Sequence, residues 1–265
     1  MLNKEQLQAS EIKDDRVLVL AGPGTGKTTT LVSRYKYLID QNVKPEEIIC
    51  CTFSRRASDE IKSRIQKEVK LNVKLLPIGT FHSLANRAVK KLANTINVTV
   101  PNSILSDNER KDIINEIKKE NPKTLEGLKF TDQVPSNILK FIDNIREQLI
   151  DPEDAYIEAS EKGNKIEVAY SEIYKLYEDY LNKKSLVDFA RMIQNAFKVF
   201  AYDAAHNKSY ISQFKHILID EYQDINFAQK SMVDELLKGG SNLWVVGDDD
   251  QAIYGWRGGN VKFIL

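Results

Sequence analysis

The stretch VLVLAGPGTGKT at residues 17–28 places a glycine-rich turn directly after a short apolar run. Glycines let the backbone curl so that successive N–H groups point at phosphate oxygens, and a following helix adds its positive N-terminal end. The lysine of such a turn reaches the outer phosphates, and the next hydroxyl ligates Mg²⁺. The alternative is a glycine-rich turn that ends in Lys-Thr by chance. The residues that we interpret as a nucleotide-binding loop are Gly22, Pro23, Gly24, Thr25, Gly26, Lys27 and Thr28.

A second stretch, HILIDEYQD at 216–224, supplies the carboxylates that such a loop needs on the metal side. Asp220 stands at the end of the apolar run, and we expect it to hold Mg²⁺ through water. Glu221 is next to it and is expected to orient and deprotonate the attacking water. The alternative is an Asp-Glu pair that caps the next helix. Together with the loop, the two carboxylates predict an ATP hydrolase that uses ATP and Mg²⁺.

Four short apolar runs, at 16–20, 48–52, 216–220 and 243–247, are typical of buried parallel strands. A polar turn and a helical pattern follow each of them, which predicts an α/β sheet covered on both faces. After the second run, apolar residues recur every four positions from Ala57 to Val69, so an amphipathic helix with a basic outer face is expected.

The middle of the chain, residues 101–185, has a different pattern. Four prolines punctuate helical stretches such as SDNERKDIINEIKKE and SNILKFIDNIREQLI, and no convincing strand is found. We therefore expect an all-helical insertion at 101–185 that interrupts one α/β domain formed by residues 1–100 and 186–265.

Composition narrows the class of protein. Lys plus Arg and Asp plus Glu both number 38, so the net charge of zero excludes a uniformly basic nucleic-acid coat. Residues 55–91 nevertheless hold ten basic and three acidic side chains, an excess of +7, and residues 151–180 hold nine acidic and three basic ones, an excess of −6. No apolar stretch is long enough for a membrane span, and no signal-peptide core is present. The adjacent Cys50 and Cys51 argue against a disulfide framework or a metal site, so we expect a cytoplasmic protein.

Six ordered motifs resemble those of the superfamily 1A DNA helicases of the UvrD/Rep/PcrA type. They are LNKEQ (2–6), CTFSRRASDEIKSRI (51–65), GTFHSLA (79–85), SLVDFARMI (185–193), ILIDEYQDIN (217–226) and VVGDDDQAIYGWRGG (245–259). The resemblance implies a RecA-like P-loop NTPase domain, called 1A, that carries a helical insertion domain, called 1B. It also favours 3′→5′ movement. DNA repair is one pathway that suits such a helicase, and replication restart and plasmid or phage maintenance stay open beside it.

The resemblance assigns further roles by position. It implies that Gln6 contacts the adenine, that Gln251 senses the γ-phosphate and that Asp248 lies near the metal and water. Thr29 also falls at the nucleotide, although family members often carry arginine there. The residues that fall where the family contacts single-stranded DNA are Phe53, Arg55, Thr80, His82, Tyr254 and Trp256. Aromatic side chains at such positions suit a motor that must accept any base sequence, because every base can stack on them. Core packing for Tyr254 and Trp256, and a core or helix-capping role for His82, are the alternatives.

The chain ends at Leu265, shortly after the sixth motif, and the family's second motor domain is absent from it. Our leading interpretation is the N-terminal 1A/1B part of an ATP-dependent DNA helicase, whose isolated chain hydrolyses ATP slowly and does not unwind DNA. One alternative is the motor end of a helicase–nuclease subunit. The other is a naturally truncated module that binds ATP and DNA without turnover.

Overall fold

The computed structural model describes residues 2–92, 94, 100, 103–124, 133–202 and 205–248. The chain divides into two compact units, the first formed by residues 1–96 together with 196–265 and the second by residues 97–195. The first unit is therefore built from both ends of the chain, and the second is inserted between them.

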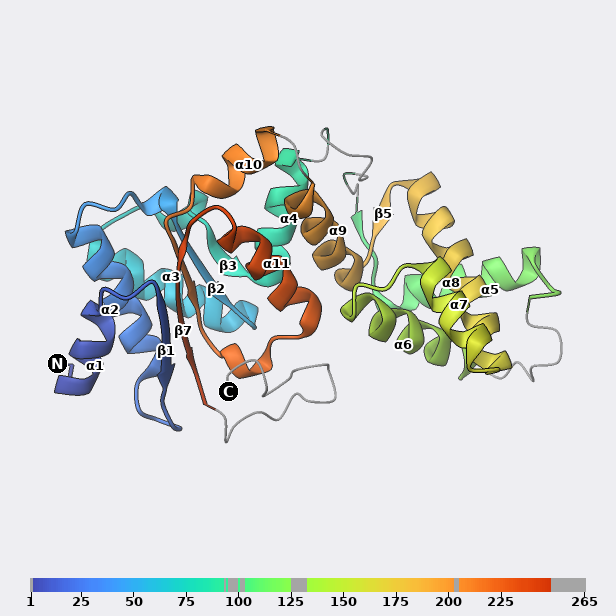
Figure 1. Ribbon diagram of the computed structural model, residues 1–265, viewed down its shortest axis with the longest axis horizontal. Coiled ribbons are helices and arrows are strands. Elements are labelled where there is room, and N and C mark those ends of the chain that lie inside the picture. Colours follow the sequence, from blue (N-terminus) through green and yellow to red (C-terminus); the bar gives the residue numbers. More distant parts are fainter. Residues whose placement is uncertain are drawn as a thin grey trace. The chain divides into compact units, whose positions relative to one another are not determined.

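The first unit contains a sheet of five strands in the order β1-β7-β6-β2-β3, and each neighbouring pair is parallel. Helices α1, α2 and α3 lie on one side of this sheet, and α4, α10 and α11 lie on the other (Figure 1). The strands are β1 (Arg16–Leu20), β2 (Ile48–Thr52), β3 (Ile78–Thr80), β6 (His216–Ile219) and β7 (Asn242–Gly247). The helices are α1 (Lys4–Glu11), α2 (Lys27–Asp40), α3 (Arg55–Val69), α4 (Phe81–Leu92), α10 (Ala205–Ser212) and α11 (Phe227–Leu237), with 3₁₀ turns at Pro45–Glu47, Val73–Leu75 and Tyr222–Asp224.

Apolar side chains explain why these segments form a covered parallel sheet. All five residues of β2 are buried, as expected for a strand with helices on both faces. Leu31 and Tyr35 of α2 and Ile61 of α3 pack with sheet residues such as Trp244 in one core cluster. The four predicted strands and the amphipathic helix after Thr52 are thereby confirmed.

The parallel arrangement brings the carboxyl ends of the strands to one edge of the sheet. The register pairs Leu20 with Gly247 and Thr52 with Thr80, so within each of these pairs the two strands end side by side. The loops that follow them therefore start at the same edge of the sheet. In open α/β sheets this edge is where ligands bind. The chain segments that leave this edge include the loop at 21–26 and the turn that begins at Asp220.

The second unit is mainly helical and has its own core. Its elements are β4 (Ser103–Ile104), α5 (Asp107–Glu120), α6 (Val134–Glu147), α7 (Pro152–Glu161), α8 (Lys165–Lys184) and β5 (Leu186–Val187). Ile114 of α5, Ile138 and Ile142 of α6 and Ile173 of α8 are fully buried in one cluster. Helix α9 (Phe189–Ala201) starts in this unit and continues into the first. Across the described part of the chain, none of the helices combines the length and the apolar character that crossing a membrane requires.

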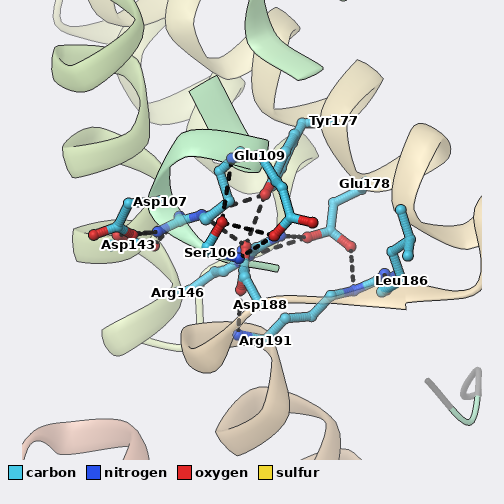
Figure 2. Close-up of polar contacts among 11 residues, drawn as sticks. Ser106, Asp107, Glu109, Asp143, Arg146, Tyr177, Glu178, Leu186, Asp188 and Arg191 are labelled. Carbon is cyan, nitrogen blue, oxygen red and sulfur yellow. Dashed lines mark hydrogen bonds and ion pairs between the residues drawn. The ribbon is translucent and has the colours of Figure 1, made fainter. Parts of the chain in front are cut away.

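A network of buried charges joins three helices of the second unit to the segment after β5 (Figure 2). Arg146, which is fully buried, donates to Asp188 Oδ2 over 2.6 Å and through Nε to Glu178 Oε1 over 3.0 Å. Arg110 binds Asp143 through Nη1 over 3.0 Å. Each of these two arginines forms an ion pair with at least one carboxylate, so neither charge is buried without a partner.

Asp188 lies at the centre of this network. Its Oδ1 accepts from the backbone N–H of Arg191 over 2.9 Å, and its Oδ2 accepts from Tyr177 Oη over 3.0 Å. Burial alone raises the pKa of Asp188, but the charges of Arg146 and Arg110 together with these hydrogen bonds outweigh it and lower the pKa to about 2. Asp188 is therefore ionised at neutral pH and anchors the first turn of α9.

Two strand predictions were incomplete. The three-residue β3 was not predicted, although it pairs with β2 at the edge of the sheet. In the region where only helices were expected, Ser103 and Ile104 of β4 pair in parallel with β5. Both segments are too short to produce the alternation of four to eight residues that marks a strand in a sequence.

Candidate nucleotide site

The glycine-rich loop connects the end of β1 to the start of α2. Gly24 has φ 71° and Gly26 has φ 85°, in the left-handed region that side chains disfavour. A Cβ on Gly26 would also lie 2.8 Å from Gln6 Nε2. Because Gly26 precedes the first residue of α2 and has no side chain, the N–H groups of the first turn have no side-chain cap. They are available to an anion at this helix end.

Lys27 is the first residue of α2, and its ammonium group lies between two carboxylates. Its Nζ is 3.4 Å from Glu221 Oε2 and 3.7 Å from Asp248 Oδ2. The Lys27 side chain is only 10% exposed, yet Nζ makes no hydrogen bond within the described ranges. A buried ammonium group that lacks hydrogen bonds is costly unless a further anion binds it.

Thr28 and Asp220 bring a hydroxyl and a carboxylate together. Thr28 Oγ1 donates to Asp220 Oδ2 over 3.4 Å across 192 positions of sequence. Burial and the neighbouring charge of Glu221 raise the pKa of Asp220 to about 6, and hydrogen bonds from the Glu221 N–H and Thr28, together with the Lys27 charge, offset part of the rise. Oxygen ligands of this kind suit Mg²⁺, which usually completes its shell with water and phosphate oxygens.

Glu221 is held in position by Gln223, which lies in the motif at 217–226 but was given no role in the sequence analysis. Glu221 has φ 54°, a left-handed conformation that costs about 1 kcal/mol or more in a residue with a side chain. The buried Gln223 donates from Nε2 to Glu221 Oε2 over 2.8 Å, and its Oε1 accepts from the Asp248 N–H over 3.0 Å. Gln223 thus links the turn after β6 to the end of β7.

Gln6 lies against the glycine-rich loop. It forms a reciprocal cap with Asn3 at the start of α1, in which Gln6 Oε1 accepts from the Asn3 N–H over 2.9 Å. Its Nε2 donates to the backbone oxygen of Thr25 over 2.8 Å. Thr25 Oγ1 in turn donates to the Gly22 oxygen over 2.7 Å, which closes a tight turn around Pro23. The amide of Gln6 is therefore next to the loop, as a contact with a bound nucleotide would require.

Four of the predicted DNA-contacting residues lie at or just after the carboxyl ends of β2 and β3. Phe53 is half-buried directly after β2, and Arg55 is exposed at the start of α3. Thr80 is the last residue of β3, and its hydroxyl accepts from the Ser83 N–H over 3.2 Å. His82 is half-buried in the first turn of α4, where burial and the charge of Arg55 lower its pKa to about 4. His82 is therefore neutral at pH 7.

The remaining predicted site residues, Gln251, Tyr254 and Trp256, lie outside the described residues. The described residues at the carboxyl edge of the sheet nonetheless come from the sequence motifs, Gln223 included. In a comparison with protein families, the model of the UvrD/REP helicase N-terminal domain matches residues 2–265. The chain belongs to the UvrD/REP helicase family.

Curated relatives of this UvrD/REP helicase domain are named as ATP-dependent DNA helicases. The chain is 32% identical over all 265 residues to the ATP-dependent DNA helicase PcrA of Staphylococcus epidermidis, and equally so to that of Staphylococcus aureus. In both comparisons the match covers 100% of this chain but 35% of the relative. The chain thus spans about a third of the length of the curated relatives that it matches.

The residues of this UvrD/REP helicase domain fit a nucleotide and a divalent cation. One lysine faces the three carboxylates of Asp220, Glu221 and Asp248, so the site has an excess of negative charge. No group of three or more His, Cys, Asp or Glu side chains is arranged as a metal cage among the residues that the structure describes. A cation here would take its remaining ligands from phosphate and water, which is the usual way for Mg²⁺.

Proposed function

We propose that this chain is the ATP- and single-stranded-DNA-binding N-terminal part of an ATP-dependent DNA helicase. In this proposal residues 1–100 and 186–265 form motor domain 1A, and residues 101–185 form insertion domain 1B. The observation that carries it is the position of Lys27, a buried ammonium group without hydrogen bonds in the described part of the chain, at a helix end that has no side-chain cap. The printed names of the relatives, both ATP-dependent DNA helicases, support the same assignment.

The chemistry follows from the positions of these residues. Lys27 and the first N–H groups of α2 would bind the outer phosphates of ATP. Thr28 and Asp220 would hold Mg²⁺, which when bound neutralises phosphate charge. Glu221 would accept the proton of the attacking water, and Gln223 keeps its carboxylate oriented through the 2.8 Å hydrogen bond.

The DNA part of the proposal rests on residues at and after the carboxyl ends of β2 and β3. Phe53, Thr80 and His82 offer an aromatic ring, a hydroxyl and a neutral imidazole, and the basic α3 raises the positive potential beside them. Tyr254 and Trp256 would add stacking surfaces, and Gln251 would couple the γ-phosphate to the DNA. Movement in the 3′→5′ direction, a role in repair and a cytoplasmic location belong to the same proposal. Translocation would need a second motor domain, so slow hydrolysis and no unwinding are expected from this chain alone.

Two variants test the nucleotide site. Lys27→Ala should lower the affinity for Mg-ATP at least about tenfold, because the phosphates lose a charge-assisted contact in a buried site. Glu221→Gln should retain binding and lose turnover, because the amide cannot accept the proton. Isothermal titration calorimetry measures the first effect, and phosphate release measures the second. Both variants should keep the circular dichroism spectrum of the parent.

Unchanged ATP affinity in Lys27→Ala would sink the assignment of the loop. Equal turnover in Glu221→Gln and the parent would instead point to a module that binds ATP without hydrolysing it. Titration with labelled oligo-dT tests the DNA part: binding that weakens as salt increases is expected. No binding at low salt would contradict that part alone.

A further inference from the structure

Thr52 is the last residue of β2, and its hydroxyl is buried without a hydrogen bond. The residue is only 1% exposed, and Oγ1 has no partner among the residues that the structure describes. An unsatisfied hydroxyl in a protein interior costs stability, and valine, which has nearly the same shape, would avoid that cost. A threonine at the end of the buried strand IICCT is therefore unfavourable for the fold alone, unless its hydroxyl binds a further group.

The pairing of β2 with β6 places Thr52 beside Asp220, because the Asp220 N–H donates to the oxygen of Cys51 over 2.9 Å. Side chains alternate along a strand, so Thr52 shares a face of the sheet with Cys50. Asp220 shares a face with Leu218 for the same reason. Cys50 and Leu218 belong to the core cluster with α2 and α3, which lie on one side of the sheet (Figure 1). Thr52 and Asp220 are therefore neighbours on the side of α2.

The carboxylate of Asp220 has its own hydrogen bonds. Its Oδ1 accepts from the Glu221 N–H over 3.1 Å, and its Oδ2 accepts from Thr28 Oγ1 over 3.4 Å. Because Thr28 is the second residue of α2, the second bond confirms that the Asp220 side chain points to the side of α2. Lys27 Nζ is another buried atom without a hydrogen bond in the described ranges. Unsatisfied groups of β2 and of α2 thus lie around the place proposed for phosphate and cation.

We propose that Thr52 is a positioning residue whose hydroxyl binds a water of the Mg²⁺ hydration shell. The inference rests on the proposed function, because it requires Mg-ATP at the loop and at Asp220. Proteins usually hold Mg²⁺ through one or two side chains and leave it several waters, which need hydrogen-bond acceptors around them. The threonine hydroxyl has two acceptor lone pairs and a donor that rotates, so it can bind such a water. A contact of this kind orients the shell of the ion without touching ATP.

The experiment measures ATP binding by calorimetry, once with Mg²⁺ and once with EDTA. Thr52→Val should bind ATP in EDTA as the parent does, whereas the factor by which Mg²⁺ strengthens ATP binding should fall about fivefold, because the shell of the ion loses one hydrogen bond. Thr52→Ser, which keeps the hydroxyl, should keep the full Mg²⁺ effect. Without nucleotide, Thr52→Val should unfold at the same urea concentration as the parent or at a higher one, because an unsatisfied buried hydroxyl has been removed.

Equal Mg²⁺ effects in Thr52→Val and the parent would overturn the inference. An equal loss of affinity in Mg²⁺ and in EDTA would also overturn it, because the hydroxyl would then contact ATP itself. A lower urea midpoint of Thr52→Val, or a Thr52→Ser variant that loses the Mg²⁺ effect as well, would indicate a structural role instead.

Lys27→Ala separates the two levels of the argument. If the parent does not bind ATP, or if Lys27→Ala binds it as tightly as the parent, the proposed function fails and the inference fails with it. If Lys27→Ala binds ATP more weakly while Thr52→Val keeps the full Mg²⁺ effect, only the inference about Thr52 fails.

Discussion

Two clusters of buried charged side chains stand out among the residues that the structure describes, one around Asp188 in the second unit and one around Asp220 in the first. In the second unit, three arginines bind three carboxylates, and the pKa of Asp188 falls to about 2. At the carboxyl edge of the sheet, one lysine faces three carboxylates, and burial together with Glu221 raises the pKa of Asp220 to about 6. Both aspartates are buried, so the difference is in their partners.

The difference separates a structural cluster from a binding site. A network whose donors and acceptors are mutually satisfied holds helices together and leaves no group for a ligand. A cluster with an unsatisfied ammonium group, a strained Glu221 and raised carboxylate pKa values is less favourable in isolation, as functional sites commonly are. The same residue types thus have opposite roles because their charges balance in one place and not in the other.

The largest effect is expected from breaking the satisfied network. Arg146→Ala removes the 2.6 Å ion pair from Asp188, which is fully buried, and removing one partner of a buried pair typically costs about 3–5 kcal/mol. Urea unfolding followed by circular dichroism measures the loss. Lys175→Ala is the matched control, because its 2.7 Å ion pair with Glu153 is largely exposed and should contribute little to stability. Equal effects of the two variants would contradict a structural role for the network.

A smaller effect is expected from acid. The folded pKa of Asp188, about 2, lies below its ordinary value of 3.8, so its ionised form stabilises the fold fully above pH 4, and this contribution is lost as the pH falls from about 4 to 2. The loss should be about 2 kcal/mol. Asp188→Asn should be less stable than the parent at pH 6 and should show a shallower decline between pH 4 and 2. Parallel pH profiles of unfolding free energy for the two proteins would refute this account.

The smallest effect is expected at the nucleotide edge, and it has the opposite sign. Burial and Glu221 raise the pKa of Asp224 to about 6, and its Oδ1 has no hydrogen bond within the part of the chain that the structure describes. In the folded protein the carboxyl form therefore predominates below about pH 6. The stability that it contributes is fully present below about pH 4 and is lost as the pH rises through 6. Asp224→Asn should raise the unfolding free energy by about 1 kcal/mol at pH 8 and leave it unchanged at pH 4. Destabilisation at pH 8 would indicate that the Asp224 charge is structurally paired.

Sequence and structure contributed differently to the two regions. The loop at 21–28, the four main strands and the helices at 106–120 and 136–150 could be predicted because each depends on neighbouring residues. A glycine-rich turn, an apolar run or a helical repeat can be recognised from a short stretch of sequence. The pairing of Asp220 with the loop could be expected as well, since parallel strands bring their carboxyl ends to one edge.

The tertiary structure alone decided which charges are paired. No sequence pattern marks Arg110 and Arg146 as partners of Asp188. The hydrogen bonds from Gln223 to Glu221 and from Arg64 to Thr29 likewise correspond to no periodic pattern in the sequence. These contacts join residues brought together by helix packing or by a single tight turn. Local sequence determines the backbone conformation and the motifs, whereas the satisfaction of a buried charge depends on every element packed around it. That is why the motifs of this helicase domain were visible in its sequence, and the contrast between its structural and its binding charges was not.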